Sequence, residues 1–140
     1  MKGRVLVAGF ATRHIAQSAC RAGYTVYAVD HFCDRDLAWY TEDRLSFDEL
    51  ADLPAKIAEL AARHPVDALV VASGAEAVGT TIPLCGTPPA KVERFLDKLE
   101  IQRFFEGLDV PVPPLAGRDR YPAMVKPRRG AGGWRNAVAW

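Results

Sequence analysis

Short apolar runs separated by amphipathic stretches fill the first half of the chain. Two such runs, residues 4–9 (RVLVAG) and 24–30 (YTVYAVD), are typical of strands that are buried on both faces of a sheet. Between them, apolar residues recur at helical spacing from Ile15 to Cys20, and Gly23 ends the predicted helix. A strand, a helix and a second strand in succession predict a parallel sheet with a right-handed crossover.

Residues 47–64 carry a second helical pattern. Its apolar stripe comprises Leu50, Leu53, Ile57, Leu60 and Ala61. Pro54 interrupts this pattern, so we expect the helix proper to begin at Leu53 or Pro54 and to end before Pro65. Residues 34–46, just before it, predict only a loop and a helical turn. Residues 66–72 (VDALVVA), just after it, predict a third buried strand.

The rest of the chain predicts one helix, an extended connector and a hairpin. The helix is expected to run from Pro89 to about Glu106, and its apolar residues available for burial are Val92, Phe95, Leu96, Leu99, Phe104 and Phe105. The run VPVPPLAG, which prolines punctuate, then extends the chain. A strand at 123–126, a glycine-rich loop and a returning strand at 136–140 close the pattern.

The predicted fold class is therefore α/β, with a Rossmann-like parallel sheet flanked by helices and then an incomplete β-hairpin. We place the sheet domain at residues 1–86 and the connecting helix with its proline-rich connector at residues 87–115. We expect the hairpin, at residues 116–140, to be the start of a further domain.

The composition of the chain indicates its class, partners and compartment, but not which reaction it takes part in. Hydrophobic residues make up 49% of the chain and charged residues 25%, as in globular proteins. A net charge of +1 gives no global field for nucleic acid or an anionic membrane, and we expect neither as a partner. Three cysteines without a paired spacing indicate reduced thiols, and no stretch has the pattern of a signal peptide. We therefore expect a cytoplasmic protein.

The turn after the first apolar run resembles the opening of a dinucleotide-binding fold. Gly9 is in place, and Asp30 ends the second strand where a ribose-binding carboxylate would lie. Ala11 and His14, however, stand where the fingerprint requires glycine, and their side chains would crowd a pyrophosphate. Dinucleotide binding is therefore the less favoured alternative. Arg13, at a helix start near the sheet edge, could instead hold an anionic group.

The acidic stretch DHFCDRD offers the types of residue that bind metals. Its candidates are Asp30, His31, Cys33, Asp34 and Asp36. Their spacing matches neither a zinc nor an EF-hand pattern, and aspartates before a helix more often form turns and caps. We therefore expect no metal site from these residues.

The closing segment YPAMVKPRRGAGGWRNAVAW reverses the order of a P-loop, because Lys126 precedes the glycines and no helix follows. In a hairpin, small residues allow backbone N–H groups to face phosphate oxygens, while a strand lysine supplies a point charge. Pro127 holds Lys126 extended. From the residues alone, a solvated glycine-rich turn without a ligand explains the segment equally well.

The runs TPPAKVERFLDKLEIQRFFEGLDVPVPP and YPAMVKPRRGAGGWRNAV resemble the passage into the ATP-binding region of ATP-grasp proteins. In that family a DK-containing helix leads to an extended connector, a strand with a lysine and a glycine-rich flap. The beginning of the chain, with VLVAGF and AGYTVYAVD, is similar to the pre-ATP-grasp domain. The nearest group is the predicted carboligases related to biotin carboxylase and tyramine–glutamate ligase.

The resemblance assigns roles to particular residues. Lys98 matches the helix lysine that reaches ATP phosphate, and Lys126 matches the strand lysine at the α- and β-phosphates. The flap over the phosphoryl groups corresponds to Gly130, Ala131, Gly132 and Gly133. By location only, the loops in which the pre-ATP-grasp domain often helps to bind the acceptor substrate contain Thr12, Arg13, Ser73, Gly74 and Glu76.

The reaction that the resemblance implies is ATP-dependent ligation of a small-molecule carboxylate to an amine through an acyl phosphate. The family's adenine-binding hinge and magnesium ligands lie beyond the flap and are not in this sequence. We therefore expect ATP and Mg²⁺ as cofactors of the complete protein, no catalytic residue or metal ligand here, and no activity of the 140-residue chain alone. Self-association or a complementing chain stays open, and so does a non-catalytic interaction module.

Overall fold

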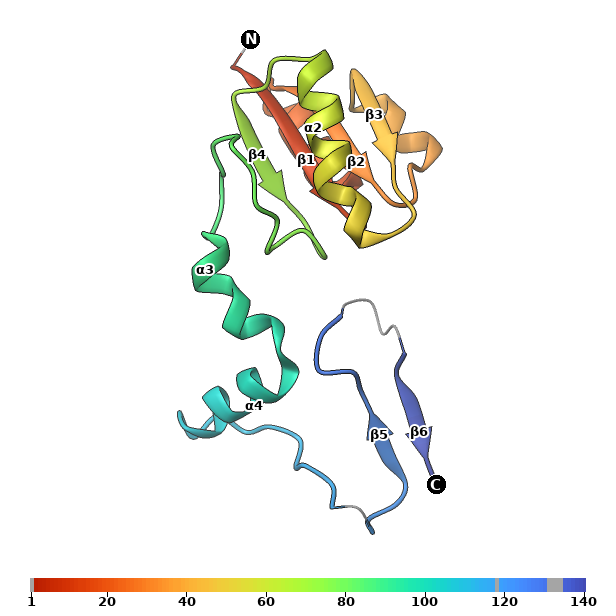
Figure 1. The fold of residues 1–140 in the computed structure, drawn as a ribbon, viewed down its shortest axis with the longest axis vertical. Coiled ribbons are helices and arrows are strands. Elements are labelled where there is room, and N and C mark those ends of the chain that lie inside the picture. The colour runs from red at the N-terminus through yellow and green to blue at the C-terminus, as the bar shows by residue number, and fades with distance from the viewer. Residues whose placement is uncertain (1, 118, 131–134) are drawn as a thin grey trace. The chain divides into compact units, whose positions relative to one another are not determined.

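A four-stranded parallel sheet organises the first of two compact units, Met1–Pro89 and Ala90–Trp140. The computed structural model describes residues 2–117, 119–130 and 135–140. The sheet has the order β3-β2-β1-β4 (Figure 1). Its strands are β1 (Arg4–Gly9), β2 (Thr25–Asp30), β3 (Asp43–Ser46) and β4 (Ala68–Val71).

Helices cover both faces of the sheet because side chains alternate along each strand. Leu6 and Ala8 of β1 face a core that they share with α2 (Leu53–Arg63), which crosses the sheet in Figure 1. Val5 and Val7 face the opposite core, which contains Ala16 of α1 (Arg13–Arg21) and Leu37 of the 3-10 turn η1 (Arg35–Trp39). The unit is therefore a three-layer α/β sandwich.

The edge strand β3 was not predicted. It runs parallel to β2, with Tyr27 opposite Asp43 and Asp30 opposite Ser46. Its four residues, DRLS, include one large apolar side chain, so they carry neither an apolar run nor a detectable alternation. The expectation of a loop and a helical turn was correct for η1 and wrong for this strand. The other three strands lie where the sequence predicts them.

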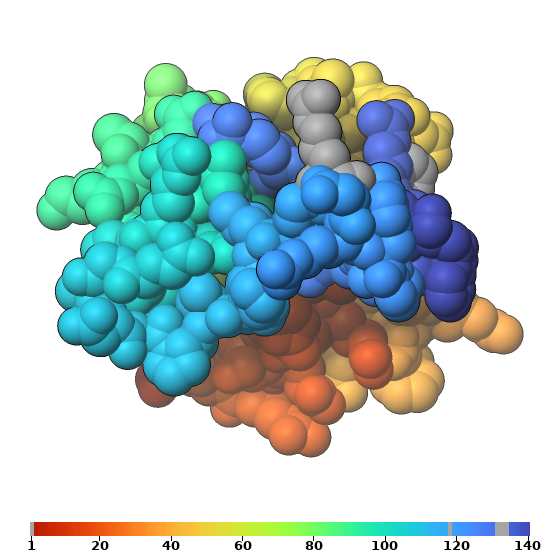
Figure 2. Space-filling view, turned by 90° about the horizontal axis from the view of Figure 1, so that it is seen from below, coloured from red at the N-terminus to blue at the C-terminus, as the bar shows by residue number. Residues whose placement is uncertain are grey.

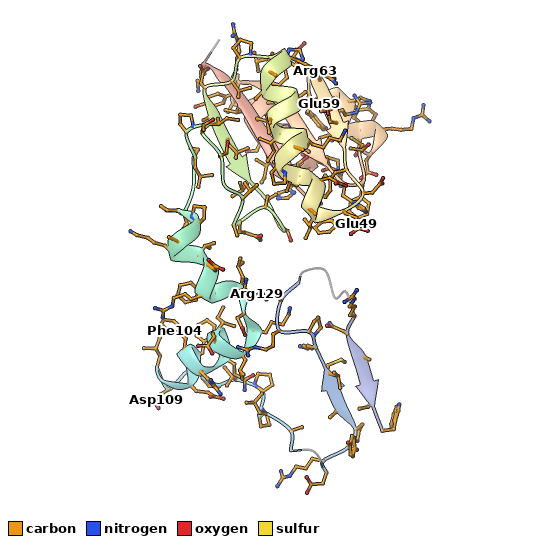
Figure 3. The ribbon with its side chains drawn as sticks, in the orientation of Figure 1. Glu49, Glu59, Arg63, Phe104, Asp109 and Arg129 are labelled. Carbon is orange, nitrogen blue, oxygen red and sulfur yellow. The ribbon has the colours of Figure 1, made fainter. Side chains whose placement is uncertain are left out.

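Helix α2 begins at Leu53, with Pro54 in the first turn, where a missing N–H leaves no hydrogen bond unmade. Leu53, Ile57 and Leu60 are buried as predicted. Leu50 belongs instead to the preceding turn η2 (Leu50–Asp52) and is 42% exposed, so its place on the buried stripe was wrong. On the solvent side, Glu59 and Arg63 form an ion pair one turn apart (Figure 3), which contributes little stability in water.

Gly9 ends β1 with a φ of 153° and lies against the end of β4. A Cβ atom at this position would lie 2.8 Å from the Cβ of Ala72 and 3.0 Å from the carbonyl oxygen of Ser73. The adjoining Phe10 N–H donates to the same Ser73 oxygen at 2.8 Å. Glycine is therefore required by backbone packing at this turn, whether or not a ligand binds there.

Replacing Gly9 with alanine is expected to lower the free energy of unfolding by about 2 kcal/mol, because the variant combines an unfavourable φ with overlap of the new Cβ atom and Ala72. Gly79→Ala is the matched control, since nothing lies within 4 Å of the place that its Cβ would take, and its φ lies outside the left-handed region. It should change the free energy by less than about 0.5 kcal/mol. Urea denaturation followed by circular dichroism measures both, and equal effects would contradict this account.

The second unit begins with a helix that is broken, where one continuous helix was predicted. Its segments are α3 (Pro89–Val92), the 3-10 turn η3 (Glu93–Leu96) and α4 (Lys98–Glu106). Asp97 interrupts them with extended backbone, φ −92° and ψ 114°, and its side chain caps α4. Aspartate favours a cap over a helix interior because its carboxyl group competes for backbone N–H groups.

An extended connector and a hairpin complete the second unit. Atoms of the connector lie at the surface of the face that Figure 2 shows. Strands β5 (Ala123–Val125) and β6 (Ala137–Ala139) pair antiparallel, with Ala123 opposite Ala139. The predicted fold class, a parallel sheet flanked by helices and followed by a hairpin, is confirmed. No helix in the described part of the chain is long and apolar enough to span a membrane.

Candidate functional site

Lys98 joins the start of α4 to the loop that follows β5. Its ammonium group donates a hydrogen bond to the carbonyl oxygen of Gly130 at 2.7 Å. Its backbone N–H donates to the carbonyl oxygen of Arg128 at 2.8 Å. The helix lysine and the first glycine of the flap segment, 32 residues apart in the sequence, are therefore in direct contact.

Lys126 follows β5 directly and is exposed. Among the described residues, its ammonium group has no ion pair or hydrogen bond, so it can approach a ligand without breaking an internal contact. Gly130, four residues on, has a φ of 122°, which residues with side chains rarely adopt. The other three flap residues, Ala131, Gly132 and Gly133, lie outside the described residues.

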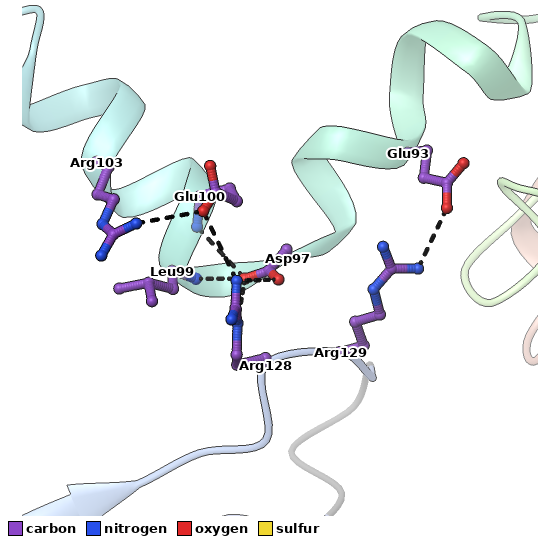
Figure 4. Close-up of polar contacts among 7 residues, drawn as sticks. All are labelled: Glu93, Asp97, Leu99, Glu100, Arg103, Arg128 and Arg129. Atoms are coloured by element: carbon purple, nitrogen blue, oxygen red, sulfur yellow. Dashed lines mark hydrogen bonds and ion pairs between the residues drawn. The ribbon is translucent and has the colours of Figure 1, made fainter.

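Asp97 and Arg128 form the strongest polar contact at this site (Figure 4). Arg128 donates from Nε to Oδ1 of Asp97 at 3.0 Å and from its terminal nitrogen to Oδ2 at 2.6 Å. Such two-point contacts fix orientation as well as distance. The same Oδ1 also accepts from the N–H groups of Leu99 and Glu100. One carboxyl group therefore caps α4 and holds the loop.

Further ion pairs surround this contact and are weaker. Arg128 also lies 3.7 Å from a carboxyl oxygen of Glu100. Arg129 approaches Glu93 at 3.4 Å, and both side chains are more than half exposed (Figure 4). Exposed pairs of this kind contribute at most about 1 kcal/mol. The geometry of residues 128–130 is therefore determined mainly by Asp97 and Lys98.

The Arg128 guanidinium, by its hydrogen bonds, holds the pKa of Asp97 below its ordinary value, and Asp97 raises the pKa of Arg128 in turn. Hydrogen bonds from the N–H groups of Leu99 and Glu100 act on Asp97 in the same direction. Both groups are therefore charged throughout the neutral range.

Acidification is expected to weaken this contact only at low pH. Because the pKa of Asp97 is lower in the folded than in the unfolded chain, its contribution is complete above the unfolded value of about 3.9 and is lost as the pH falls through the folded value. A carboxyl-carbon NMR titration should therefore give Asp97 a pKa below about 3.9, and Arg128→Gln should raise that pKa toward this value, while the N–H groups of Leu99 and Glu100 still lower it. Titration of Asp97 near 3.9 in the unsubstituted chain would contradict the assignment.

At the carboxyl edge of the first unit's sheet, Thr12 and Asp30 engage each other. Thr12 is fully buried, and both its N–H and its hydroxyl donate to Oδ2 of Asp30, the hydroxyl at 2.8 Å. Oδ1 of Asp30 accepts from the N–H groups of Phe32 at 2.9 Å and Cys33 at 2.8 Å. In a dinucleotide-binding fold, the carboxyl group at the place of Asp30 would bind ribose. Here it accepts hydrogen bonds from neighbouring loops of the same chain.

The other substrate candidates flank this edge. Arg13 is paired with Asp36 at 2.7 Å at the surface. After β4, the N–H of Gly74 donates to the Glu76 carboxyl group at 2.8 Å. Ser73 presents its carbonyl oxygen to Phe10 rather than to solvent. The structure thus places Arg13 at the first position of α1 and Ser73, Gly74 and Glu76 in the loop after β4, and it gives each an internal contact.

The acidic stretch after β2 is not arranged around a metal position. Within the described ranges, no group of three or more His, Cys, Asp or Glu side chains could hold a metal ion. Burial, and next the neighbouring Asp30, raise the pKa of the Cys33 thiol, so the thiolate that metals bind is disfavoured. His31 contacts the Phe47 carbonyl oxygen through Nδ1 at 2.9 Å.

Asp97 and Arg128 lie in the runs that carry the family resemblance, but sequence reasoning assigned neither of them a role. The helical pattern places Asp97 in a helix interior, and it predicts no role for Arg128 beyond that of a solvated side chain. An aspartate immediately before a lysine and a run of good helix formers is a signal for a cap, and it was available in the sequence. Its pairing with Arg128, 31 residues away, has no local signal.

Neither a protein-family model nor a curated protein matches the chain in sequence. Solved structures do match in fold. N5-carboxyaminoimidazole ribonucleotide synthetase from Thermus thermophilus has 20% identity and a TM-score of 0.61 over 96% of this chain and 40% of that one. L-amino acid ligase from Bacillus licheniformis has 15% identity and a TM-score of 0.62 over 99% of this chain and 39% of that one.

The N5-carboxyaminoimidazole synthetase from Staphylococcus aureus, in complex with ADP, has 16% identity and a TM-score of 0.66. The match covers 99% of this chain and 41% of that one. The chain thus spans about two fifths of the structures that it matches. Its sheet, its helices and its hairpin together have the fold of the amino-terminal portion of ATP-grasp ligases.

Proposed function

We propose that the chain is the amino-terminal portion of an ATP-dependent ligase that joins a carboxylate to an amine. The observation that carries this proposal is the contact between the Lys98 ammonium group and the Gly130 carbonyl oxygen. It brings a lysine at a helix start to the beginning of a glycine-rich loop. The likeness in fold to solved ligases, one of them in complex with ADP, supports the same function.

The proposed reaction proceeds in two steps. A carboxylate oxygen attacks the γ-phosphorus of ATP, and the bond to the β–γ bridging oxygen breaks to release ADP. A neutral amine then attacks the acyl carbon of the resulting acyl phosphate, inorganic phosphate leaves with the bonding electrons, and the nitrogen gives up one proton to the departing phosphate. Negative charge is concentrated on the phosphoryl oxygens in the first step, so fixed cations near them lower its barrier.

In this proposal Lys98 and Lys126 supply those cations. Lys98 uses one N–H donor on Gly130 and has two left for phosphate oxygens. Lys126, exposed after β5, contributes the second ammonium group. Mg²⁺ would serve the same reaction, but the described residues offer no cluster that fits it, so no step is assigned to it. The 140-residue chain is accordingly proposed to bind nucleotide weakly and to turn over no ATP.

The acceptor substrate is proposed to approach the carboxyl edge of the first unit's sheet. Arg13 begins α1 just after β1, and Gly74 and Glu76 lie in the loop after β4, at the edge where parallel α/β folds bind ligands. Ser73 and Thr12 enter the proposal only through the backbone of the same loops, because their described contacts are internal.

A titration of the ¹⁵N-labelled chain with ADP tests the proposal. Amide shifts are expected at residues 97–98, 126 and 128–130, and NADH should cause none at residues 9–14 or 30. NADH binding at these last residues would favour the dinucleotide alternative. If ADP has no effect and light scattering shows concentration-dependent association, the interaction module is the better interpretation.

A further inference from the structure

The segment that follows Lys126 is attached to the start of α4 at several points. The chain leaves β5 at Val125, and three residues later Arg128 meets Asp97 through two nitrogen atoms. The Arg128 carbonyl oxygen accepts the Lys98 N–H, and the Gly130 carbonyl oxygen accepts the Lys98 ammonium group. Residues 128–130 therefore cannot move from α4 without losing charged as well as neutral hydrogen bonds. Figure 4 shows the contact between Asp97 and Arg128.

We propose that Asp97 and Arg128 are positioning residues, which hold the two phosphate-facing lysines of the proposed nucleotide site at a fixed separation. This inference rests on the proposed function and extends it to two residues that need not touch the nucleotide. Asp97 orients Lys98 by capping the helix that Lys98 begins. Arg128 orients Lys126, two residues before it, by anchoring the end of the segment.

The geometry favours a positioning role for Arg128 over a phosphate-binding role. Its guanidinium contacts the Asp97 carboxyl group at 3.0 and 2.6 Å, and the Asp97 side chain is only 13% exposed. A phosphate would have to displace or share that partner. Arg129, the neighbouring arginine, has only an exposed contact at 3.4 Å and carries the same charge. It is therefore a natural reference for effects of charge alone.

Preorganisation is the physical reason for the expected effect. A flexible loop must lose conformational freedom before both lysines can meet one phosphate chain, and that loss weakens binding. A loop already held by a two-point charged contact loses less. Removing either partner should therefore weaken anion binding even though neither partner contacts the anion.

Substitution of Asp97 by asparagine separates this account from simple electrostatics. Asparagine caps helices as well as aspartate does, so α4 keeps its cap while the charged contact with Arg128 is lost. Removing a negative charge near an anion site would by itself tighten binding. A positioning role predicts the opposite, a Kd for ADP and inorganic tripolyphosphate raised about tenfold.

The test compares Asp97→Asn, Arg128→Gln and Arg129→Gln in the 140-residue chain by isothermal titration with both anions, with circular dichroism to verify folding. The first two variants should bind about tenfold more weakly, and Arg129→Gln should change the Kd by about twofold or less. Asp97→Asn and Arg128→Gln should also show faster hydrogen exchange of the Lys98 backbone amide.

Two results would overturn the inference in distinguishable ways. If the unsubstituted chain binds and Asp97→Asn binds equally or more tightly, positioning is wrong while the nucleotide site stands. If the unsubstituted chain binds neither anion at millimolar concentration, the proposed function fails and the inference fails with it.

Discussion

Replacing Asp30 with alanine is expected to lower the free energy of unfolding by about 3 kcal/mol. The Asp30 carboxyl group is 3% exposed and accepts hydrogen bonds from Thr12, Phe32 and Cys33. Alanine leaves three backbone N–H groups and one hydroxyl without their acceptor, and Thr12 is too deeply buried for water to replace it. Urea denaturation of the whole chain measures the loss.

Asp36→Ala is the control for this prediction. Asp36 also lies in the acidic stretch after β2, but it pairs with an exposed Arg13 side chain at the surface. Its removal should cost less than about 0.5 kcal/mol. An Asp30→Ala variant as stable as Asp36→Ala would show that the carboxyl group is not structural, and it would reopen the ribose-binding alternative.

Replacing Lys98 or Lys126 with methionine is expected to raise the Kd of the chain for ADP about tenfold or more. Methionine keeps much of the length and apolar character of lysine but removes the ammonium group, and hydrogen bonds to charged groups are worth about 1.5–3 kcal/mol. Lys98→Met also leaves the Gly130 carbonyl oxygen without its donor, so its effect should be the larger of the two. Isothermal titration measures both.

Lys91→Met is the matched control, because it removes the same charge from an exposed position on α3. It should change the Kd by about twofold or less. Equal losses in all three variants would mean that ADP responds only to the overall charge of the chain. A loss at Lys98 alone would support the helix lysine and remove the strand lysine from the proposed site.

The predictable part of the fold is the part in which burial is two-sided. Strands β1 and β2 lie in the centre of the sheet, so their sequences are continuous apolar runs. Strand β4 lies at the other edge, but its residues ALVV are all apolar and Leu69 also pairs with Leu84. Strand β3 at the edge has Leu45 as its single large apolar residue, and a local pattern cannot reveal it. Its pairing with β2 is determined by tertiary contacts, among them the 2.8 Å contact between Asp43 and His64.

The family resemblance nominates candidate residues one by one, but the sequence does not give their arrangement. The family resemblance selected Lys98, Lys126 and Gly130, and the structure brings Lys98 and Gly130 together. The break in the helix at Asp97 was missed because the flanking residues all favour helix, while the decisive partner lies 31 residues away. Contacts at such separation have no periodic signal in one sequence.

Acylation by an ATP analogue that carries a reactive acyl group on its γ-phosphate tests the central claim most directly. A lysine amine near the phosphates attacks the acyl carbon, and ATP leaves, so the modified lysines report the site. Of the five lysines in the chain, Lys98 and Lys126 should be labelled, and excess ATP should prevent it. Peptide mass spectrometry that finds Lys2, Lys56 and Lys91 labelled to the same extent, with no protection by ATP, would contradict the account.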